Sequence, residues 1–371
     1  MSLTVFLFWA SLYVYVPILP VHAERLGASF AGVGVVVAAY GLPQLLFRIP
    51  IGLWSDRIGR RRPFGLMALV ACAVGAAGLA FAPDPLTLTA ARFVTGIAAA
   101  FWVILSIHYA LHFPPHQSVL AMGRANALNS FAQVGAALAG GAIAGLGDLR
   151  LVFLAGLALA IVGVGAYAGV EDRPAGSAAA APFSRRGLPV GDLARYSTIM
   201  ALAVGVGFAT TFGFLPLLAR DVGTPTELLG TLAAVRVLAL GITALFVHQV
   251  VVRLGHNPSI ALGLLLLGAT TALSALAPEP VSLILLQVVG GVGFGLISPL
   301  TMSGAVQAAA AGSRATAMGV YQATYSVGMT GMPLAAGLLA SAFGLRSVFF
   351  ACGALCLFAM LLCFSGARRP R

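Results

Sequence analysis

The sequence predicts an all-α integral membrane protein with twelve transmembrane helices, arranged as two pseudo-symmetric six-helix bundles. Of the 371 residues, 60% are hydrophobic and only 8% are charged, whereas a soluble domain carries about 25% charged residues. The hydrophobic residues gather in long segments, and parts of the first half of the chain recur in the second half. Composition therefore predicts a chain that lies in the lipid bilayer, and the repeat predicts its division in two.

The membrane segments follow from the length of the apolar stretches. About 30 Å of hydrocarbon requires roughly 20 consecutive apolar residues in a helix, and the chain divides into twelve stretches close to that length. Most loops between them are only a few residues long, so we expect successive helices to be antiparallel neighbours. The predicted spans are residues 3–21, 30–53, 64–82, 87–111, 125–146, 150–170, 194–219, 227–250, 259–278, 281–305, 315–340 and 345–366.

The two halves of the chain carry the same membrane unit, at an offset of 196 residues. Leu19 and Pro20, for example, recur as Leu215 and Pro216. Internal duplication in a polytopic membrane chain is typical of secondary transporters, whose binding site lies between the halves. The matching segments are residues 19–27 with 215–223, 52–62 with 248–258, and 149–153 with 345–349.

One long polar interval divides the chain into two domains. Residues 171–192 form the only low-complexity stretch, rich in alanine, proline and glycine, and such a composition is typical of a linker. We therefore predict an N-terminal six-helix bundle over residues 1–170, a cytoplasmic linker over 171–192 and a C-terminal six-helix bundle over 193–371.

The distribution of arginine predicts the orientation in the membrane. All 21 basic residues are arginines; with both termini placed in the cytoplasm, thirteen lie on the cytoplasmic side and four lie outside, as the positive-inside rule requires. We therefore expect a multi-pass protein of the cell membrane with both termini cytoplasmic. The net charge of +11 is spread over short loops, so it indicates topology and not the binding of nucleic acid.

The cysteines do not indicate a disulfide framework or a metal site. Cys72, Cys352, Cys356 and Cys363 all fall inside predicted spans. The first span lacks the basic segment that begins a signal peptide and has its own repeat partner, so we expect it to stay in the mature protein.

A charged loop after the second predicted span is the most specific motif in the sequence. It reads Gly-x-x-x-Asp-Arg-x-Gly-Arg-Arg. This pattern resembles the signature loop of the major facilitator superfamily, and the similarity extends over the whole chain through the repeated six-helix plan. Trp54 stands where the family usually has leucine. The residues of this gate motif are Gly52, Asp56, Arg57, Gly59, Arg60 and Arg61.

The resemblance implies that the gate motif latches the cytoplasmic side of the two halves when the protein opens outward. We expect Gly52 to allow a close approach between helices, Asp56 to lie against a helix N-terminus or pair with an arginine, and Gly59 to permit a tight turn. The alternative is that the arginines only set topology. In the second half Val252 stands where Asp56 does, so the latch is expected to be asymmetric.

Two weaker elements of the family are also present, and the second of them bears on the direction of transport. Arg92, followed four residues later by Gly96, resembles another element of the family, with Thr95 in place of the usual glutamine; its copy in the tenth span begins at Gln287. Glycines within residues 135–141 resemble the glycine-rich element of antiporters but lack its proline. The resemblance therefore favours an exporter.

Two arginines are predicted to lie inside the membrane, where an ionised side chain costs about 2.5–3.5 kcal/mol or more. Arg236 lies about nine residues into the eighth span and Arg92 about five residues into the fourth. All ten acidic residues fall in loops or at helix ends. A proton would therefore have to be carried by Glu24, Asp221 or Glu227 at the outer mouth, or by a histidine.

Polar and aromatic residues in the spans predict an amphipathic cavity suited to a small organic molecule. Some of the set are expected to form ordinary interhelical hydrogen bonds, and the set includes Tyr13, Tyr15, Trp102, Asn126, Asn129, Gln133, Thr210, Thr211 and Gln322. The candidates for substrate or coupling contacts are Arg92, Arg236, Gln287, Tyr40, Tyr321 and Tyr325.

Taken with the resemblance, the sequence predicts a secondary active transporter that moves a small organic solute across the cytoplasmic membrane by alternating access, by proton-coupled efflux. The alternative is an exchanger or importer of an organic anion that uses Arg92 and Arg236. A remote alternative is a non-transporting membrane sensor or enzyme, for which the sequence shows no catalytic constellation. We expect a monomer in the lipid bilayer that is not an enzyme and needs no cofactor or metal.

Overall fold

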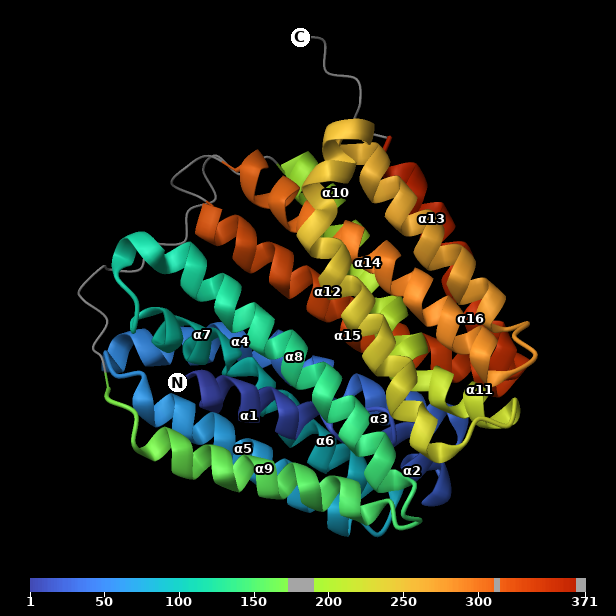
Figure 1. Ribbon diagram of the computed structural model, residues 1–371, viewed down its shortest axis with the longest axis horizontal. Helices are drawn as coiled ribbons and strands as arrows, with labels where there is room; N and C mark the ends of the chain where they lie inside the picture. The colour runs from blue at the N-terminus through green and yellow to red at the C-terminus, as the bar shows by residue number, and fades with distance from the viewer. Residues whose placement is uncertain (173–189, 310–313, 365–371) are drawn as a thin grey trace. The chain divides into compact units, whose positions relative to one another are not determined.

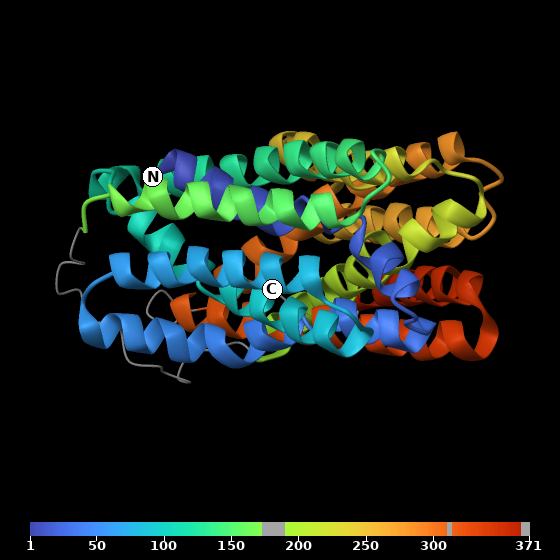
Figure 2. The same cartoon turned by 90° about the horizontal axis from the view of Figure 1, so that it is seen from below.

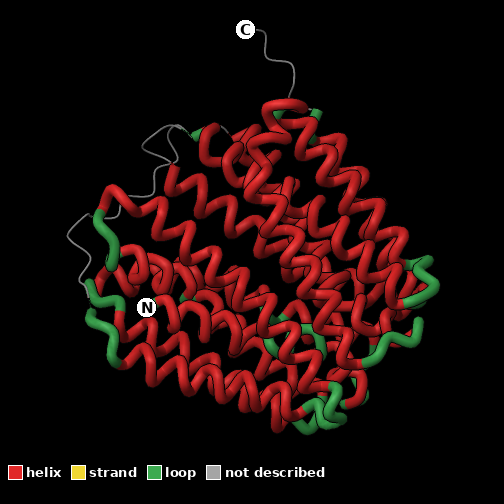
Figure 3. Tube along the Cα trace, viewed as in Figure 1, coloured by secondary structure: helices red, strands yellow, loops and turns green. Residues whose placement is uncertain are grey.

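The computed structural model describes residues 1–172, 190–309 and 314–364. Within these ranges the regular structure is helical, without a β-strand, and short loops join the helices (Figure 3). Eleven helical segments among the described residues are long and apolar enough to cross a membrane. The all-α membrane fold predicted from composition and segment length is confirmed.

The first ten helices carry the chain through the predicted N-terminal half (Figure 1). They are α1 Ser2–Tyr13, α2 Leu19–Arg25, α3 Phe30–Ala38, α4 Gly41–Ile58, α5 Arg62–Phe81, α6 Pro85–Ala100, α7 Trp102–Ala110, the short 3₁₀ helix η1 Pro115–Gln117, α8 Ser118–Ala144 and α9 Arg150–Ala168.

The remaining helices carry the chain through the predicted C-terminal half. They are α10 Val190–Ala209, the π-helix η2 Thr210–Phe214, α11 Leu215–Asp221, the 3₁₀ helix η3 Thr226–Leu228, α12 Leu229–Leu254, α13 His256–Ser274, α14 Pro280–Ala308, α15 Arg314–Phe343 and α16 Leu345–Leu362.

The first predicted span, residues 3–21, is not one continuous helix. It consists of the apolar helix α1, a series of turns over residues 14–18, and α2. Pro17 has no N–H to donate to the carbonyl of Tyr13, which instead accepts from the N–H of Val16 at 3.2 Å. This proline therefore interrupts the regular helix, and the segment continues through the turns into α2.

Several helices begin where the sequence provides a cap. Asp84 Oδ1 accepts from the N–H groups of Leu86 and Thr87 at 2.8 and 3.0 Å, and Pro85 is the first residue of α6. Ser29 caps α3 in the same manner, because its hydroxyl accepts from the N–H of Gly32. These local signals start helices even inside a uniformly apolar sequence.

The described residues fold into two compact units. Unit 1 comprises the described part of Met1–Ala180 together with Pro225–Ala234, and unit 2 comprises the described parts of Ala181–Thr224 and Val235–Arg371. Pro225–Ala234 belongs to unit 1 because η3 and the start of α12 pack on α8. The predicted domain boundaries place this short segment in the second half of the chain instead.

In unit 1, α5 packs against α6 and α9, and α1 packs against α8 and α9 (Figures 1 and 2). Glycine makes the closest of these approaches. A Cβ atom at Gly140 of α8 would collide with the carbonyl oxygen of Val14, and one at Gly65 of α5 would collide with the ring of Tyr167. Small residues let backbones approach where the bilayer gives no hydrophobic drive for helix association.

In unit 2, α10 packs against α15, and α13 packs against α14 and α16. Glycines again stand at the crossings. A Cβ atom at Gly328 of α15 would collide with the carbonyl of Ala201, and one at Gly263 of α13 would lie 2.7 Å from the carbonyl oxygen of Gly293. The two units thus use the same kind of helix contact.

Local geometry repeats between the units at the predicted offset. Gly27 and Gly223 both have positive φ angles, 90° and 79°, and each ends a short helix. The residue that follows, Ala28 or Thr224, donates its N–H to the carbonyl five residues earlier, at 3.0 Å in unit 1 and 2.9 Å in unit 2. The duplication read from the sequence is therefore visible as repeated hydrogen bonding.

Candidate functional sites: a charged loop and two buried arginines

The gate motif forms the end of α4 and the turn into α5. Gly59 ends α4 with φ of +69°, a conformation that side-chain-bearing residues rarely adopt, and its N–H donates to the carbonyl of Ser55 at 3.0 Å. In unit 2, Gly255 follows α12 with φ of +87° and an N–H donated to the carbonyl of Val251 at 2.8 Å, but its ψ of 166° differs from the 3° of Gly59, so the left-handed helix end is not repeated. The tight turn predicted at Gly59 is present.

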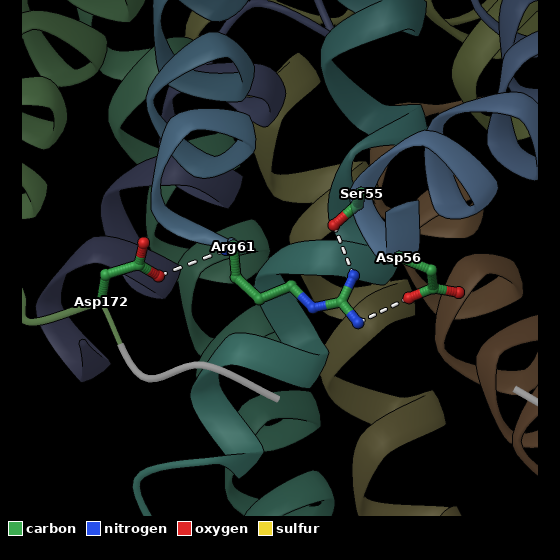
Figure 4. Close-up of polar contacts among 4 residues, drawn as sticks. All are labelled: Ser55, Asp56, Arg61 and Asp172. Atoms are coloured by element: carbon green, nitrogen blue, oxygen red, sulfur yellow. Dashed lines mark hydrogen bonds and ion pairs between the residues drawn. The ribbon is translucent and has the colours of Figure 1, made fainter. Parts of the chain in front are cut away.

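Asp56 pairs with Arg61 across this turn. A guanidinium nitrogen of Arg61 lies 2.5 Å from Asp56 Oδ1, and the other terminal nitrogen donates to the hydroxyl of Ser55 (Figure 4). The side chain of Arg61 is buried, with 7% exposed, whereas 41% of the Asp56 side chain is exposed. A half-exposed acid is thus held by a buried base, and a charge-assisted bond of this kind is stronger than a neutral one.

The backbone of the same arginine is held by a residue from far along the chain. Asp172, just after α9, accepts on Oδ1 from the backbone N–H groups of Arg61 and Arg62, at 3.2 Å each (Figure 4). Arg61 is the N-cap position of α5, and its own side chain does not cap the helix. Asp172 therefore supplies the anionic cap that the first turn of α5 lacks.

The end of α9 is fastened at further points. The guanidinium of Arg62 donates to the carbonyl oxygen of Ala168, the last residue of α9. His108 of α7 lies 2.6 Å from the hydroxyl of Tyr167 through Nδ1 and 3.1 Å from the carbonyl oxygen of Glu171 through Nε2. These contacts fix the chain on both sides of Asp172.

The other members of the gate motif lie at the surface of unit 1. Arg57 and Arg60 are exposed, and a surface groove is lined by Arg60 together with Arg62, Pro63, Leu66 and Asp172. A Cβ atom at Gly52 would meet no described atom of unit 1 within 4 Å, so the close approach predicted for this glycine is not made inside that unit.

Arg92 of α6 is buried in unit 1 between aromatic rings. Its guanidinium carbon lies 4.2 Å from the ring centre of Tyr40 and 5.8 Å from that of Tyr15, and Nη1 donates to the hydroxyl of Thr95 at 3.3 Å. Only 3% of the residue is exposed. Cation–π contacts with two tyrosines thus take the place of an acidic partner.

Arg236 of α12 is buried in unit 2 against an amide and glycines. Its Nη1 lies 3.4 Å from Gln287 Oε1, which also accepts from the hydroxyl of Thr211 at 3.2 Å. The guanidinium lies against Gly207 of α10 and Gly290 of α14, where a Cβ atom would come within 3.7 and 3.1 Å of it. The absence of side chains at these glycines makes the room for the arginine.

Neither buried arginine has an acidic partner among the described residues. No carboxylate oxygen there lies within 4.0 Å of Arg92 or Arg236, whereas Arg61 pairs with Asp56 and Arg195 with Asp192. Both guanidinium groups therefore carry a charge that only neutral groups surround.

The predicted substrate candidates fall into three groups. Tyr40 joins Arg92, and Gln287 joins Arg236, as described above. Tyr321 and Tyr325 of α15 lie together, with ring centres 6.0 Å apart, and the hydroxyl of Tyr321 lies 2.9 Å from that of Thr301.

Sequence reasoning missed Asp172 and Ser55 as partners of the gate motif. Asp172 stands 111 residues after Arg61, in a stretch read as the start of the linker, so no local spacing signal could have found it. Ser55 lies inside the motif, and its type does not distinguish a helix surface residue from a partner of Arg61. The four cysteines are buried and free, and no group of metal-ligating side chains occurs in the described ranges.

A duplicated bundle of membrane-spanning helices, with a charged loop after its second span and a buried arginine in each unit, defines a polytopic transporter of the duplicated type. The family model described as Major Facilitator Superfamily matches residues 1–196 and 197–371. The chain belongs to the major facilitator superfamily. Its multi-pass helical fold is the fold of the membrane transporters in this family.

Curated relatives match parts of the chain. It is 36% identical to the inner membrane transport protein YajR of Escherichia coli (strain K12) over 99 residues, which cover 26% of this chain and 22% of YajR. It is 31% identical to the multi-drug resistance efflux pump PmrA of Streptococcus pneumoniae serotype 4 over 155 residues, which cover 40% of this chain and 38% of PmrA. These matches thus span less than two-fifths of either relative.

Solved structures match the whole fold. The nucleoside transporter NupG, as its D323A mutant, superposes with a TM-score of 0.85, covering 99% of this chain and 98% of NupG at 14% sequence identity. At this identity the likeness concerns the fold alone.

Proposed function

We propose that this protein is a secondary active transporter that exports a small organic solute across the cytoplasmic membrane by alternating access, with protons as the coupling ion. Both termini lie in the cytoplasm, and the transporter acts as a monomer made of two six-helix halves. Membership of the superfamily supports the mode of transport. The likeness to PmrA, an efflux pump by name, supports the direction.

The observation that carries the proposal is the ion pair between Asp56 and Arg61 at the end of α4. We propose that this pair, with Asp172 behind it, forms the part of the cytoplasmic gate that unit 1 contributes. The pair is suited to such a role because Arg61 is buried and held at both its backbone and its side chain, while Asp56 keeps an exposed face.

The test is the variant Asp56→Asn, with Asp192→Asn as the matched control. Asp192 also pairs with an arginine, Arg195, at 3.4 Å, and its side chain has the same 41% exposure, but it lies outside the gate motif. We expect Asp56→Asn to lower the transport rate per inserted molecule at least about tenfold, whereas Asp192→Asn keeps the wild-type rate. Equal rates in both variants would contradict the proposed gate.

A second candidate function is the exchange or import of an organic anion. The observation that favours it is the pair of buried arginines without a carboxylate partner among the described residues. A carboxylate or phosphate on the solute would supply the missing charge at Arg236 or Arg92.

Binding titrations decide between the two candidates. On the anion hypothesis, Arg236→Gln weakens binding of an anionic probe such as benzoate at least about tenfold and leaves a cationic probe such as tetraphenylphosphonium unaffected or better bound. Equal loss for both probes would instead assign Arg236 to the structure of unit 2.

A further inference from the structure

The first membrane segment of each half is interrupted at the same place. In unit 1 the helix gives way to turns over residues 14–18, and in unit 2 it widens into the π-helix η2 over Thr210–Phe214. The two interruptions coincide at the 196-residue offset of the duplication. Both lie just before a short helix, α2 or α11, that completes the segment.

Prolines explain why each helix is interrupted. They do not explain why the interruption is a series of turns in unit 1 and a π-helix in unit 2. Pro216, the second residue of α11, has no N–H to donate to the preceding turn. The N–H of Leu215 bonds to the carbonyl of Thr210, five residues earlier, and this is the π-helical bond. A single widened turn of this kind is uncommon, so the surrounding side chains must stabilise it.

In unit 2 a buried polar cluster holds the π-helix. Thr211, in the π-helix, donates to Gln287 Oε1 at 3.2 Å, and Arg236 Nη1 donates to the same oxygen at 3.4 Å. The three residues come from η2, α14 and α12 and are 3%, 5% and 6% exposed. One amide oxygen thus connects the π-helix to the buried charge.

In unit 1 the residues at the equivalent positions also form a buried cluster around an arginine. Tyr15 corresponds to Thr211 and Tyr40 to Arg236 at the 196-residue offset. Arg92, in the motif whose copy begins at Gln287, lies over the rings of both tyrosines. The buried cation therefore comes from the fourth membrane segment in unit 1 and from the second in unit 2.

A contact between backbones supports this correspondence independently. A Cβ atom at Gly96 of α6 would collide with the carbonyl of Tyr40, and one at Gly291 of α14 would collide with the carbonyl of Arg236. Glycine thus brings the same two segments together at the same residue in both units. The clusters occupy equivalent sites and do not merely resemble each other.

We propose that the cluster of Thr211, Gln287 and Arg236 is a latch that fixes the π-helix between α10 and α11, and that Gln287 is the positioning residue at its centre. The cluster of Tyr15, Arg92 and Tyr40 is its counterpart in unit 1. Each latch couples a buried charge to the interruption in the first segment of its half. The latch does not depend on the solute carried or on the gate at Asp56.

Hydrogen exchange of the full-length protein in detergent, without any ligand, tests the latch. Thr211→Val removes the donor at nearly constant volume, and Gln287→Leu removes the shared acceptor. We expect each to speed exchange of the backbone amides of residues 210–219 on the order of three- to tenfold, the equivalent of one hydrogen bond. Thr211→Ser keeps the hydroxyl and is expected to keep the wild-type rate.

The variant Gln287→Glu is expected to change the exchange rate of these amides in the opposite direction. Gln287→Glu keeps the acceptor oxygen and adds a negative charge beside Arg236, so we expect the same amides to exchange more slowly than in the wild type. A role in packing alone predicts no such slowing. Faster exchange in Gln287→Glu would therefore contradict the latch.

Two controls show that the effect is local. Thr301→Val removes another buried threonine hydroxyl of unit 2, which lies 2.9 Å from the hydroxyl of Tyr321, and it should leave residues 210–219 unchanged. In unit 1, residues 14–18 should exchange as in the wild type in both Thr211→Val and Gln287→Leu, because both substitutions lie in unit 2. Wild-type exchange in both Thr211→Val and Gln287→Leu would overturn the proposal.

Discussion

The carboxylate of Asp172 connects the start of α5 to the gate motif. Its Oδ1 accepts two backbone N–H groups at the start of α5, and the first of them belongs to Arg61, whose side chain reaches Asp56. The backbone and the side chain of Arg61 are thus held from opposite sides (Figure 4). Asp172 therefore contributes both to the stability of α5 and to the placing of the gate motif.

We predict that Asp172→Ala lowers the free energy of unfolding by about 0.5–2 kcal/mol, the usual cost of losing a helix cap. Transport should also fall, and the loss should not add to that of Asp56→Asn, because both changes act through Arg61. Transport rates of the two single variants and the double variant check this.

Asp84→Ala is the matched control, because Asp84 also caps a helix with two backbone bonds but has no contact with the gate motif among the described residues. Asp84→Ala should leave the transport rate per folded molecule unchanged. Losses that simply add in the double variant of Asp172 and Asp56 would show that Asp172 is only a cap.

The cap of α6 should contribute to the pH dependence of stability in the acid range. Hydrogen bonds from the N–H of Thr87, opposed in part by desolvation and aided by the N–H of Leu86, lower the pKa of Asp84 below its usual 3.8. The stability from this cap is therefore present above pH 3.8 and is lost as the pH falls through the lower folded-state pKa. In Asp84→Asn the protection factors of the first amides of α6, which correct the exchange rates for the intrinsic rate at each pH, should not change with pH in this range, whereas in the wild type they should fall on acidification.

At the scale of the elements, the sequence predicted helices well and interruptions poorly. Segment length and apolar content were enough for the spans, because in lipid a backbone must satisfy its own hydrogen bonds. Pro17 and Pro20 indicate a potential kink at residues 14–18, but they do not show that the helix gives way to turns there, since proline is tolerated in many membrane helices. The π-helix at Thr210–Phe214 could not be read at all, because the buried partners that stabilise it come from α12 and α14.

Glycine packing gives a prediction for single elements. Gly140→Ala should destabilise unit 1 by about 1–3 kcal/mol, because the added Cβ collides with the carbonyl of Val14. Gly135→Ala, in the same helix, meets no described atom of unit 1 within 4 Å and should be neutral or slightly stabilising through its helix propensity. Unfolding in detergent compares the two, and equal stability would show that the crossing of α8 and α1 tolerates side chains.

At the scale of the whole molecule, the duplication was the strongest signal in the sequence. It predicted the repeated hydrogen bonds after Gly27 and Gly223, and it aligns Gly59 with Gly255, which both have positive φ but differ in ψ. The candidate sites were predicted only in part: Arg92 with Tyr40 and Arg236 with Gln287 were named but not paired, because pairing depends on which faces of the helices meet. No pattern of spacing gives that information.

The central claim is that the chain moves a small organic solute against its gradient at the expense of a proton gradient. The most direct measurement is flux in proteoliposomes of the purified protein, with an imposed pH gradient and a panel of cationic, neutral and anionic solutes. We predict that at least one solute moves opposite to the protons with the wild type, and at least about tenfold more slowly with Asp56→Asn. The absence of gradient-dependent flux for every solute, or equal flux with Asp56→Asn, would contradict the account.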